Sequence, residues 1–165
     1  ATIGLMAVKS IASPKFAELY KQKEFKLLEK VTQQSTKLIF WTTLPLVALF
    51  IFFSESLMLL FGDEFKAGVF AFILLSIGRV FVSFSGAAGN LLQMCGRQVI
   101  FMNVAIIGSV INVILNFSLI PVYGINGSAI ATMISLVSFN FLLVYYVKKE
   151  FGFYTFYNPF KKADE

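Results

Sequence analysis

Four long apolar runs constrain this chain more than any other feature of its sequence. A transmembrane helix needs about 20 mostly apolar residues to cross roughly 30 Å of hydrocarbon, and each run reaches or approaches that length. Because spanning segments must satisfy their own backbone hydrogen bonds, the runs predict helices. The runs are Leu38–Phe53, extended by Leu57–Phe61, then Ala67–Met94, Val99–Val122 and Ile125–Val147.

The composition agrees with a helical membrane protein. Hydrophobic residues make up 58% of the chain and charged residues 14%, whereas an ordinary soluble domain carries about 25% charged residues. The chain has no histidine and a single cysteine, Cys95, which excludes an internal disulfide and argues against zinc sites and histidine-based catalysis. We therefore predict no metal site, no cofactor and no catalytic residue, and expect Cys95 to be a small buried hydrophobe.

The apolar runs divide the chain into segments. Thr2–Val8 is apolar but too short to span, and the first residue is Ala rather than Met. We therefore expect a C-terminal piece of a longer protein. The predicted segments are the end of a truncated transmembrane helix at 1–12, an amphipathic connector at 13–36, four transmembrane helices within 37–147 (about 37–61, 66–94, 99–121 and 125–147) and a basic tail at 148–165.

The connector has a helical pattern of its own. Between Lys15 and Gln34, apolar residues recur at about 100° per residue while lysines and other polar residues fill the remaining surface. Ser13-Pro14 is a typical helix start. We expect one amphipathic helix lying along the membrane surface, with a solvated helical connector as the alternative. The apolar positions are Phe16, Leu19, Tyr20, Leu27 and Val31.

The formal net charge is +5, and its distribution predicts the topology. Basic residues are concentrated at alternate turns, so the positive-inside rule predicts that the connector, the Arg97 turn and the tail face the cytoplasm. We expect the protein to lie in the cytoplasmic (inner) membrane of the cell. Anionic membrane lipids, rather than nucleic acid, are the expected partner of the basic residues. These are Lys9, Lys15, Lys21, Lys23, Lys26, Lys30 and Lys37 in the connector, Arg97, and Lys148, Lys149, Lys161 and Lys162 in the tail.

Arg79 is the most informative single residue. It falls near the middle of the run Ala67–Met94, where a charged side chain is costly and usually faces a protein interior or a wet cavity. One interpretation is an anion contact, since guanidinium groups bind phosphate and carboxylate oxygens. The other is an ion pair with a helix outside this chain. At helical spacing Arg79 shares one face with Ser76, Ser83, Gly86 and Asn90, and we regard Arg79, Ser76, Ser83 and Asn90 as candidate substrate-binding residues.

The third and fourth runs carry packing signals. Ser109, Asn112 and Asn116 predict a contact between helices with interhelical hydrogen bonds, or alternatively a substrate contact. Pro121, Gly124 and Gly127 predict a tight turn between the two runs.

Several of these segments resemble a known family. Ser13-Pro14-Lys15-Phe16-Ala17-Glu18-Leu19-Tyr20 resembles the entry to the cytoplasmic connector of polysaccharide exporters, and Leu91-Leu92 with Gly96-Arg97 resembles their short cytoplasmic turn. The strongest match begins at Asn112 and Asn116, continues through Ile120-Pro121, Gly124-Ile125, Gly127 and Ala129, and ends at Ala131-Thr132. It resembles the C-terminal region of the polysaccharide biosynthesis and O-antigen flippases, within the multidrug, oligosaccharidyl-lipid and polysaccharide exporter superfamily.

The resemblance implies an all-α, polytopic transmembrane helix bundle of two lobes, of which this chain would be part of the second. It also implies transport of a lipid-linked oligosaccharide, of the undecaprenyl-pyrophosphate type, by rocking of the two lobes, with the missing N-terminal lobe as the structural partner. Three alternatives stay open: a cation-coupled multidrug antiporter of the same superfamily, a flippase for a lipid-linked peptidoglycan precursor, and a structural membrane subunit. A membrane-embedded glycosyltransferase is disfavoured because the loops are short.

Overall fold

The computed structural model describes residues 2–156, with side chains from residue 12 onward. Helices account for nearly all of this part of the chain, and residues 2–156 contain no strand. The prediction of an all-α bundle is therefore confirmed. The helices are α1 (Thr2–Lys21), α2 (Phe25–Phe52), α3 (Ser54–Leu59), the 3₁₀ helix η1 (Asp63–Gly68), α4 (Val69–Ser85), α5 (Ala88–Met94) and α6 (Gln98–Phe151).

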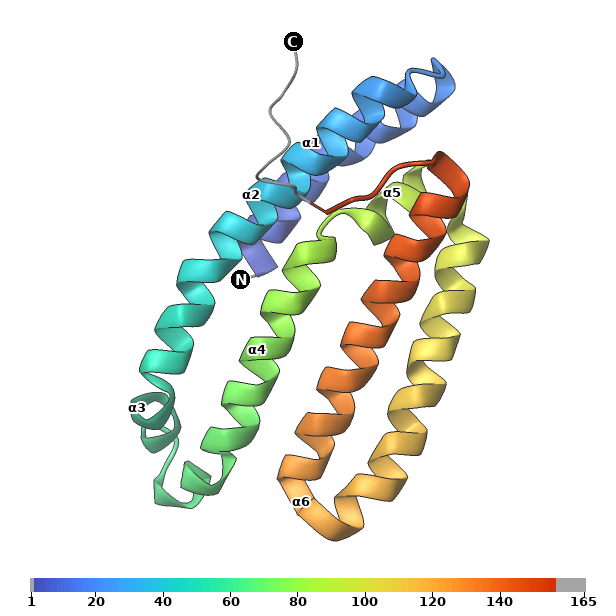
Figure 1. The fold of residues 1–165 in the computed structure, drawn as a ribbon. Helices are drawn as coiled ribbons and strands as arrows, with labels where there is room; N and C mark the ends of the chain where they lie inside the picture. Colours follow the sequence, from blue (N-terminus) through green and yellow to red (C-terminus); the bar gives the residue numbers. More distant parts are fainter. Residues whose placement is uncertain (1, 157–165) are drawn as a thin grey trace.

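The long helices lie side by side (Figure 1). α6 folds back on itself at Gly124, whose backbone is not helical (φ 55°, ψ −130°), so its two legs run in opposite directions. α4 packs between α2 and the second leg of α6, because Gly78 of α4 approaches Met133 closely and Ser85 bonds to Asn140. The order across the layer is thus α2, α4, second leg of α6 and first leg of α6.

The connector differs from its prediction. One amphipathic helix was expected over 15–34, beginning at Ser13-Pro14, but α1 runs through Pro14 and the chain then turns at 22–24. α2 begins at Phe25 and continues without a break into the apolar run that follows. α1 continues through Pro14 because Ala12, Phe16 and Leu19 form one buried face. The free energy gained from this burial outweighs the loss of one backbone hydrogen bond at the proline.

Among residues 2–156, three helices are long and apolar enough to cross a membrane. By length and apolar composition, residues 25–52, 63–85 and 98–151 each suffice to cross a bilayer. The last of these has 54 residues, and its turn at Gly124 makes it a helical hairpin. The predicted spans 37–61 and 66–94 are interrupted in the structure: α2 ends at Phe52 and is followed by the short α3, and α4 ends at Ser85.

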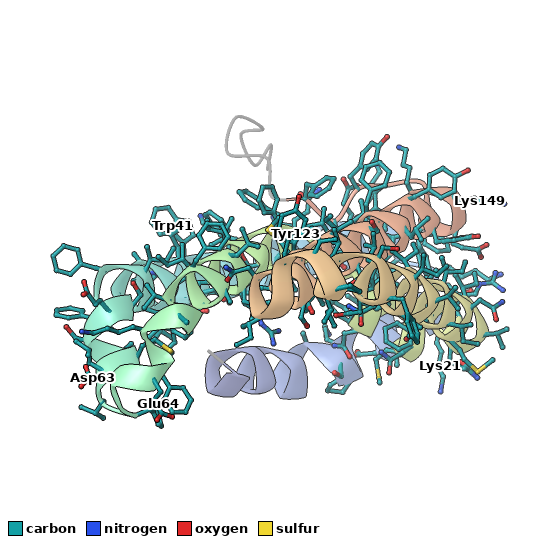
Figure 2. All side chains as sticks on the ribbon, turned by 90° about the horizontal axis from the view of Figure 1, so that it is seen from below. Lys21, Trp41, Asp63, Glu64, Tyr123 and Lys149 are labelled. Carbon is teal, nitrogen blue, oxygen red and sulfur yellow. The ribbon has the colours of Figure 1, made fainter. Side chains whose placement is uncertain are left out.

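The two ends of the molecule carry different charges. The α1–α2 turn, α5 and the end of α6 lie at one end, whereas α3, η1 and the Gly124 turn lie at the other (Figure 1). In Figure 2, Lys21 and Lys149 lie on one side of the molecule and Asp63 and Glu64 on the opposite side. We call these the basic end and the acidic end.

Most of the buried hydrophobic core lies at the basic end. Phe16 of α1, Leu28 of α2, Leu91 of α5 and Val147 of α6 are buried in one cluster. Phe153, which follows α6, is also buried in it. The predicted tail 148–165 is therefore partly packed: residues 148–151 extend α6, while residues 157–165, with Lys161 and Lys162, lie outside the described residues.

Two further contacts hold the basic end together. Arg97, in the turn between α5 and α6, pairs with Glu150 at 2.7 Å. Cys95 is buried beneath α1 with its Sγ 3.8 Å from the Phe16 carbonyl oxygen, and burial raises the pKa of its thiol to about 11. Cys95 is thus a packed, protonated thiol, as its sequence context predicted.

Unlike the basic end, the apolar lengths of the long helices have few buried residues. In the most apolar part of each candidate span, the share of buried residues is 22% for residues 25–52, 22% for residues 63–85 and 11% for residues 98–151. Side chains project from both faces of the helix layer (Figure 2). Such faces suit hydrocarbon or further helices rather than water.

Candidate functional site

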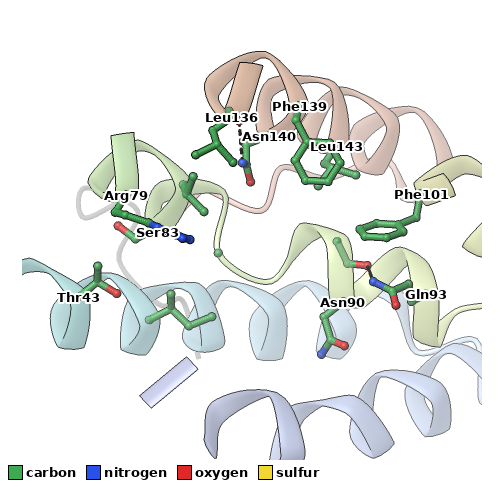
Figure 3. Close-up of a pocket in the computed structure, with 14 residues that line it drawn as sticks. Thr43, Arg79, Ser83, Asn90, Gln93, Phe101, Leu136, Phe139, Asn140 and Leu143 are labelled. Atoms are coloured by element: carbon green, nitrogen blue, oxygen red, sulfur yellow. Dashed lines mark hydrogen bonds between the residues drawn. The ribbon is translucent and has the colours of Figure 1, made fainter. Parts of the chain in front are cut away.

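Three of the four polar residues predicted from the sequence line one pocket of about 380 Å³ between α2, α4, α5 and α6. This volume lies within the range of sites for small molecules, about 300–1,000 Å³. Figure 3 shows its lining: Arg79 and Ser83 of α4 lie at one end, near Thr43 of α2, and Asn90, Gln93 and Phe101 lie at the other.

Arg79 supplies the positive charge of this pocket. It lies in the middle of α4, between an apolar first half and the break at Gly86, and its side chain is exposed within this chain. Among the described residues no hydrogen bond or ion pair reaches its guanidinium group. The five N–H donors are therefore available to an acceptor from outside residues 12–156.

The two serines predicted beside Arg79 differ in their placement. Ser83 lines the pocket, with its Oγ donating to the Val80 carbonyl at 2.6 Å. Ser76 is buried, donates to the Phe72 carbonyl at 2.7 Å and does not line the pocket. Of the four predicted substrate-binding residues, the structure thus gathers Arg79, Ser83 and Asn90 around one space and leaves Ser76 outside it.

Asn90 lines the pocket because of a helix break that the sequence analysis did not predict. The prediction treated 66–94 as one helix, but α4 stops at Gly86, which adopts φ 43° and ψ −96°. Gly86 packs directly on Thr36 of α2, whose Oγ1 accepts a hydrogen bond from the Ala87 N–H at 3.4 Å. The chain then restarts as α5, which carries Asn90. Asn90 Nδ2 donates to Ser13 Oγ at 2.9 Å and so ties α5 to α1.

The sequence did not predict most of the other lining residues, among them Thr43, Gln93, Phe101 and Asn140. Asn140 is an amide inside an apolar run, which is a usable signal for an interior position; it accepts from Ser85 Oγ at 2.5 Å and donates to the Leu136 carbonyl. Thr43, Gln93 and Phe101 have no comparable signal, because each is of a type that also occurs on lipid-facing or interfacial surfaces.

The predicted contact between the third and fourth runs is confirmed for Asn112 and not for Ser109 or Asn116. Asn112 Nδ2 donates to Ser135 Oγ of the second leg at 2.8 Å, and Gly108 lets the first leg approach Phe139 closely. Asn116 bonds within its own helix to Asn112, and Ser109 is exposed. Asn112 and Asn116 also line a second, mainly apolar pocket with Phe117.

No group of three or more His, Cys, Asp or Glu side chains within residues 12–156 is arranged to hold a metal ion. The chemistry of the pocket is therefore that of one guanidinium group, several neutral amides and hydroxyls, and aromatic rings. Such a lining can bind an anion and a neutral polar ligand.

A helical membrane protein with a cationic interior pocket is the class that the fold and site define. A family model described as MatE matches residues 2–118. The chain therefore belongs to the MatE family, whose members are transporters of the multidrug, oligosaccharidyl-lipid and polysaccharide exporter superfamily. This finding confirms the family that the sequence motifs indicated.

Two of the relatives are named for glycan or polysaccharide biosynthesis. The chain is 28% identical over 142 residues to a probable low-salt glycan biosynthesis flippase, Agl15, of Haloferax volcanii. This alignment covers 86% of this chain and 30% of Agl15. It is 30% identical over 146 residues to the capsular polysaccharide biosynthesis protein CapF of Staphylococcus aureus, covering 87% of this chain and 36% of CapF. An uncharacterized membrane protein of Methanocaldococcus jannaschii is 29% identical over 133 residues, covering 81% of this chain and 31% of that protein.

The chain spans about a third of the length of these three relatives. No solved structure matches it.

Proposed function

We propose that the full-length protein flips a lipid-linked oligosaccharide, of the undecaprenyl-pyrophosphate type, across the cytoplasmic membrane for surface polysaccharide synthesis. The observation that carries this proposal is Arg79, a cation without an acceptor among residues 12–156, which lines a mainly apolar pocket together with several neutral polar side chains. The named functions of Agl15 and CapF support a glycan-lipid cargo.

The chemistry of the cargo fits this arrangement. A lipid-linked oligosaccharide combines a pyrophosphate, a hydrophilic glycan and a long apolar tail. Moving its head through hydrocarbon requires polar groups that replace water and a cation that offsets the phosphate charge. Arg79 offers the cation, and the neutral polar lining of the pocket offers the hydrogen bonds. Rocking of two lobes around such a site would expose it to each membrane face in turn.

Complementation tests the proposed function. The full-length gene is expressed in bacteria that lack their own flippase, and surface polysaccharide and intracellular lipid-linked intermediates are both measured. We expect surface polysaccharide to return and the intermediates to fall. Accumulation of intermediates despite confirmed membrane insertion, in hosts that make several different glycans, would contradict the proposal.

A cation-coupled drug antiporter is the nearest alternative within the family. Ion coupling in a membrane generally uses an intramembrane carboxylate. The described acidic residues lie in α1, at the start of α2, near α3 and η1, and at Glu150, so none lines the pocket. Drug resistance without polysaccharide export in the complemented host would favour this alternative.

We further propose that α2 binds anionic lipids with one exposed face. Lys26, Lys30, Lys37 and Trp41 recur at spacings of four, seven and four residues, which places them together on the side of α2 opposite the buried Leu28. Trp41 is 58% exposed and suits the interface between headgroups and hydrocarbon. Under this proposal and the positive-inside rule, the basic end and the C-terminal end of α6 would face the cytoplasm.

Exchanging Lys26 and Lys30 for glutamine in the full-length protein tests the lipid contact. Each lysine near an anionic surface contributes about 1 kcal/mol. The wild type should therefore have a higher free energy of unfolding in phosphatidylglycerol than in phosphatidylcholine, and this difference should be smaller by roughly 2 kcal/mol in the double variant. Thermal unfolding in nanodiscs of the two lipids measures this difference. Lys66→Gln, at the acidic end, is the matched control, and an equal loss in that variant would disprove a specific basic face.

A further inference from the structure

The pocket has two chemically different ends. At the first, Arg79 and Ser83 lie near Thr43, within the apolar length of the helices. At the second, toward the basic end, Gln93 of α5 and Phe101 of α6 line the space, and no charged side chain is among the lining residues there (Figure 3). An anion is favoured at the first end only.

Phe101 is held in a fixed position at the second end. Gly89 of α5 lies directly beneath it, since a Cβ at residue 89 would come 3.0 Å from Phe101 Cε2. The ring of Phe139 packs edge-to-face against it, with ring centroids 5.9 Å apart and an interplanar angle of 78°. Phe101 itself is half-buried. A ring that is already ordered loses little conformational entropy when a ligand packs on it.

Gln93 adds hydrogen-bonding capacity beside this ring. Its Nε2 donates to the Gly89 carbonyl at 3.2 Å, which orients the amide, and its side chain is exposed. Within residues 12–156 no hydrogen bond is made to Gln93 Oε1. The second end therefore offers an aromatic surface together with an amide acceptor.

A neutral ligand with an apolar face and a polar edge fits this combination. A pyranose ring has such faces: its axial C–H groups form an apolar surface, and its hydroxyls form a polar rim. The electron-rich face of an aromatic ring attracts the partly positive C–H groups, and amides hydrogen-bond to hydroxyls. A phosphate would gain nothing from the ring and would be left without a counter-charge.

From this division we propose that Phe101, with Gln93, binds the membrane-proximal sugar of the transported lipid by stacking, while the Arg79 end binds its phosphate. The inference rests on the proposed function and deepens it. It makes Phe101 and Gln93 specificity-determining residues, because they contact the glycan and not the part common to all polyprenyl pyrophosphates.

The test compares two ligands on purified full-length protein: undecaprenyl pyrophosphate carrying a single N-acetylhexosamine, and undecaprenyl pyrophosphate without sugar. Loss of an aromatic contact of about 0.5–1.5 kcal/mol corresponds to roughly 2- to 13-fold in affinity. We therefore expect Phe101→Leu to weaken binding of the sugar-bearing lipid by about that factor and to leave the bare lipid unchanged. Phe101→Tyr should restore binding of the sugar-bearing lipid.

Two further variants sharpen the result. Gly89→Ala, which removes no ligand-contacting group but displaces the ring, should reproduce the selective loss. Phe81→Leu, on the exposed side of α4 and outside the pocket, should bind both lipids as the wild type does.

The outcomes separate this inference from the proposed function. Equal weakening of both lipids by Phe101→Leu, or no weakening of either, overturns the glycan-binding role of Phe101. If Arg79→Gln leaves both affinities unchanged while Phe101→Leu acts selectively, the phosphate contact fails and the sugar contact stands. A wild-type protein that binds neither lipid overturns both.

Discussion

Replacing Arg79 with glutamine in the full-length protein is expected to reduce polysaccharide export by roughly 10- to 150-fold, because a hydrogen bond to a charged group contributes about 1.5–3 kcal/mol. Arg79 makes no ion pair or hydrogen bond with residues 12–156, so glutamine breaks neither kind of interaction within this part of the chain. The amount of protein in the membrane should not fall, since a central arginine itself costs about 2.5–3.5 kcal/mol on insertion. Export assays and quantitative membrane immunoblots measure the two effects.

Lysine at position 79 separates charge from geometry. Lys retains the positive charge but not the planar fork that binds two oxygens at once, so we expect partial export. Arg97→Gln is the matched control: Arg97 is half-exposed, lies outside the pocket, and its partly exposed pair with Glu150 contributes about 1 kcal/mol. Loss of Arg79→Gln from the membrane would instead indicate an ion pair with a carboxylate elsewhere in the full-length protein.

Replacing Gly86 with alanine is expected to destabilise the protein by about 2–6 kcal/mol. A side chain at φ 43°, ψ −96° is strained by roughly 1–3 kcal/mol, and crowding in a packed interior adds about 1–3 kcal/mol. The crowding is specific: a Cβ at residue 86 would come 2.7 Å from Thr36 Cγ2 and 2.9 Å from its Cα. Thermal unfolding of the full-length protein in detergent measures the loss.

Gly96→Ala controls for backbone strain alone. Gly96 also has a positive φ, of 75°, but a Cβ there would meet no atom within 4 Å. It should cost only about 1–2 kcal/mol. Thr36→Ala should rescue part of the Gly86→Ala loss, although the Thr36 Cα remains close. Equal effects at positions 86 and 96 would show that α2 and the break after α4 are not in close contact.

The sequence predicted those parts of the structure that depend on composition along one helix. The apolar runs located the long helices, and the contact between the legs of α6 followed from Asn112. Arg79 was identified because a charge in an apolar run has few explanations. Each of these signals is contained in the residue type and its immediate neighbours.

The parts that were missed depend on contacts between distant segments. The turn at 22–24 contains no Gly, Pro or Asn, and Lys23 adopts a left-handed conformation (φ 59°) because α1 and α2 pack against each other. The end of α4 at Gly86 requires Thr36, which lies 50 residues earlier. Phe101 enters the pocket only because α5 folds back beside the start of α6.

The core at the basic end also implies an order of events during biosynthesis. Its members range along the chain from Ala12 to Phe153, so the first and last described segments meet in one cluster. A ribosome delivers Phe153 only after every long helix has been made. Until then the apolar faces of Phe16 and Leu28 lack their final cover and stay exposed to water, where apolar burial is the main driving force for closure. This cluster can therefore close completely only after Phe153 has been synthesised, so its final packing is a late step.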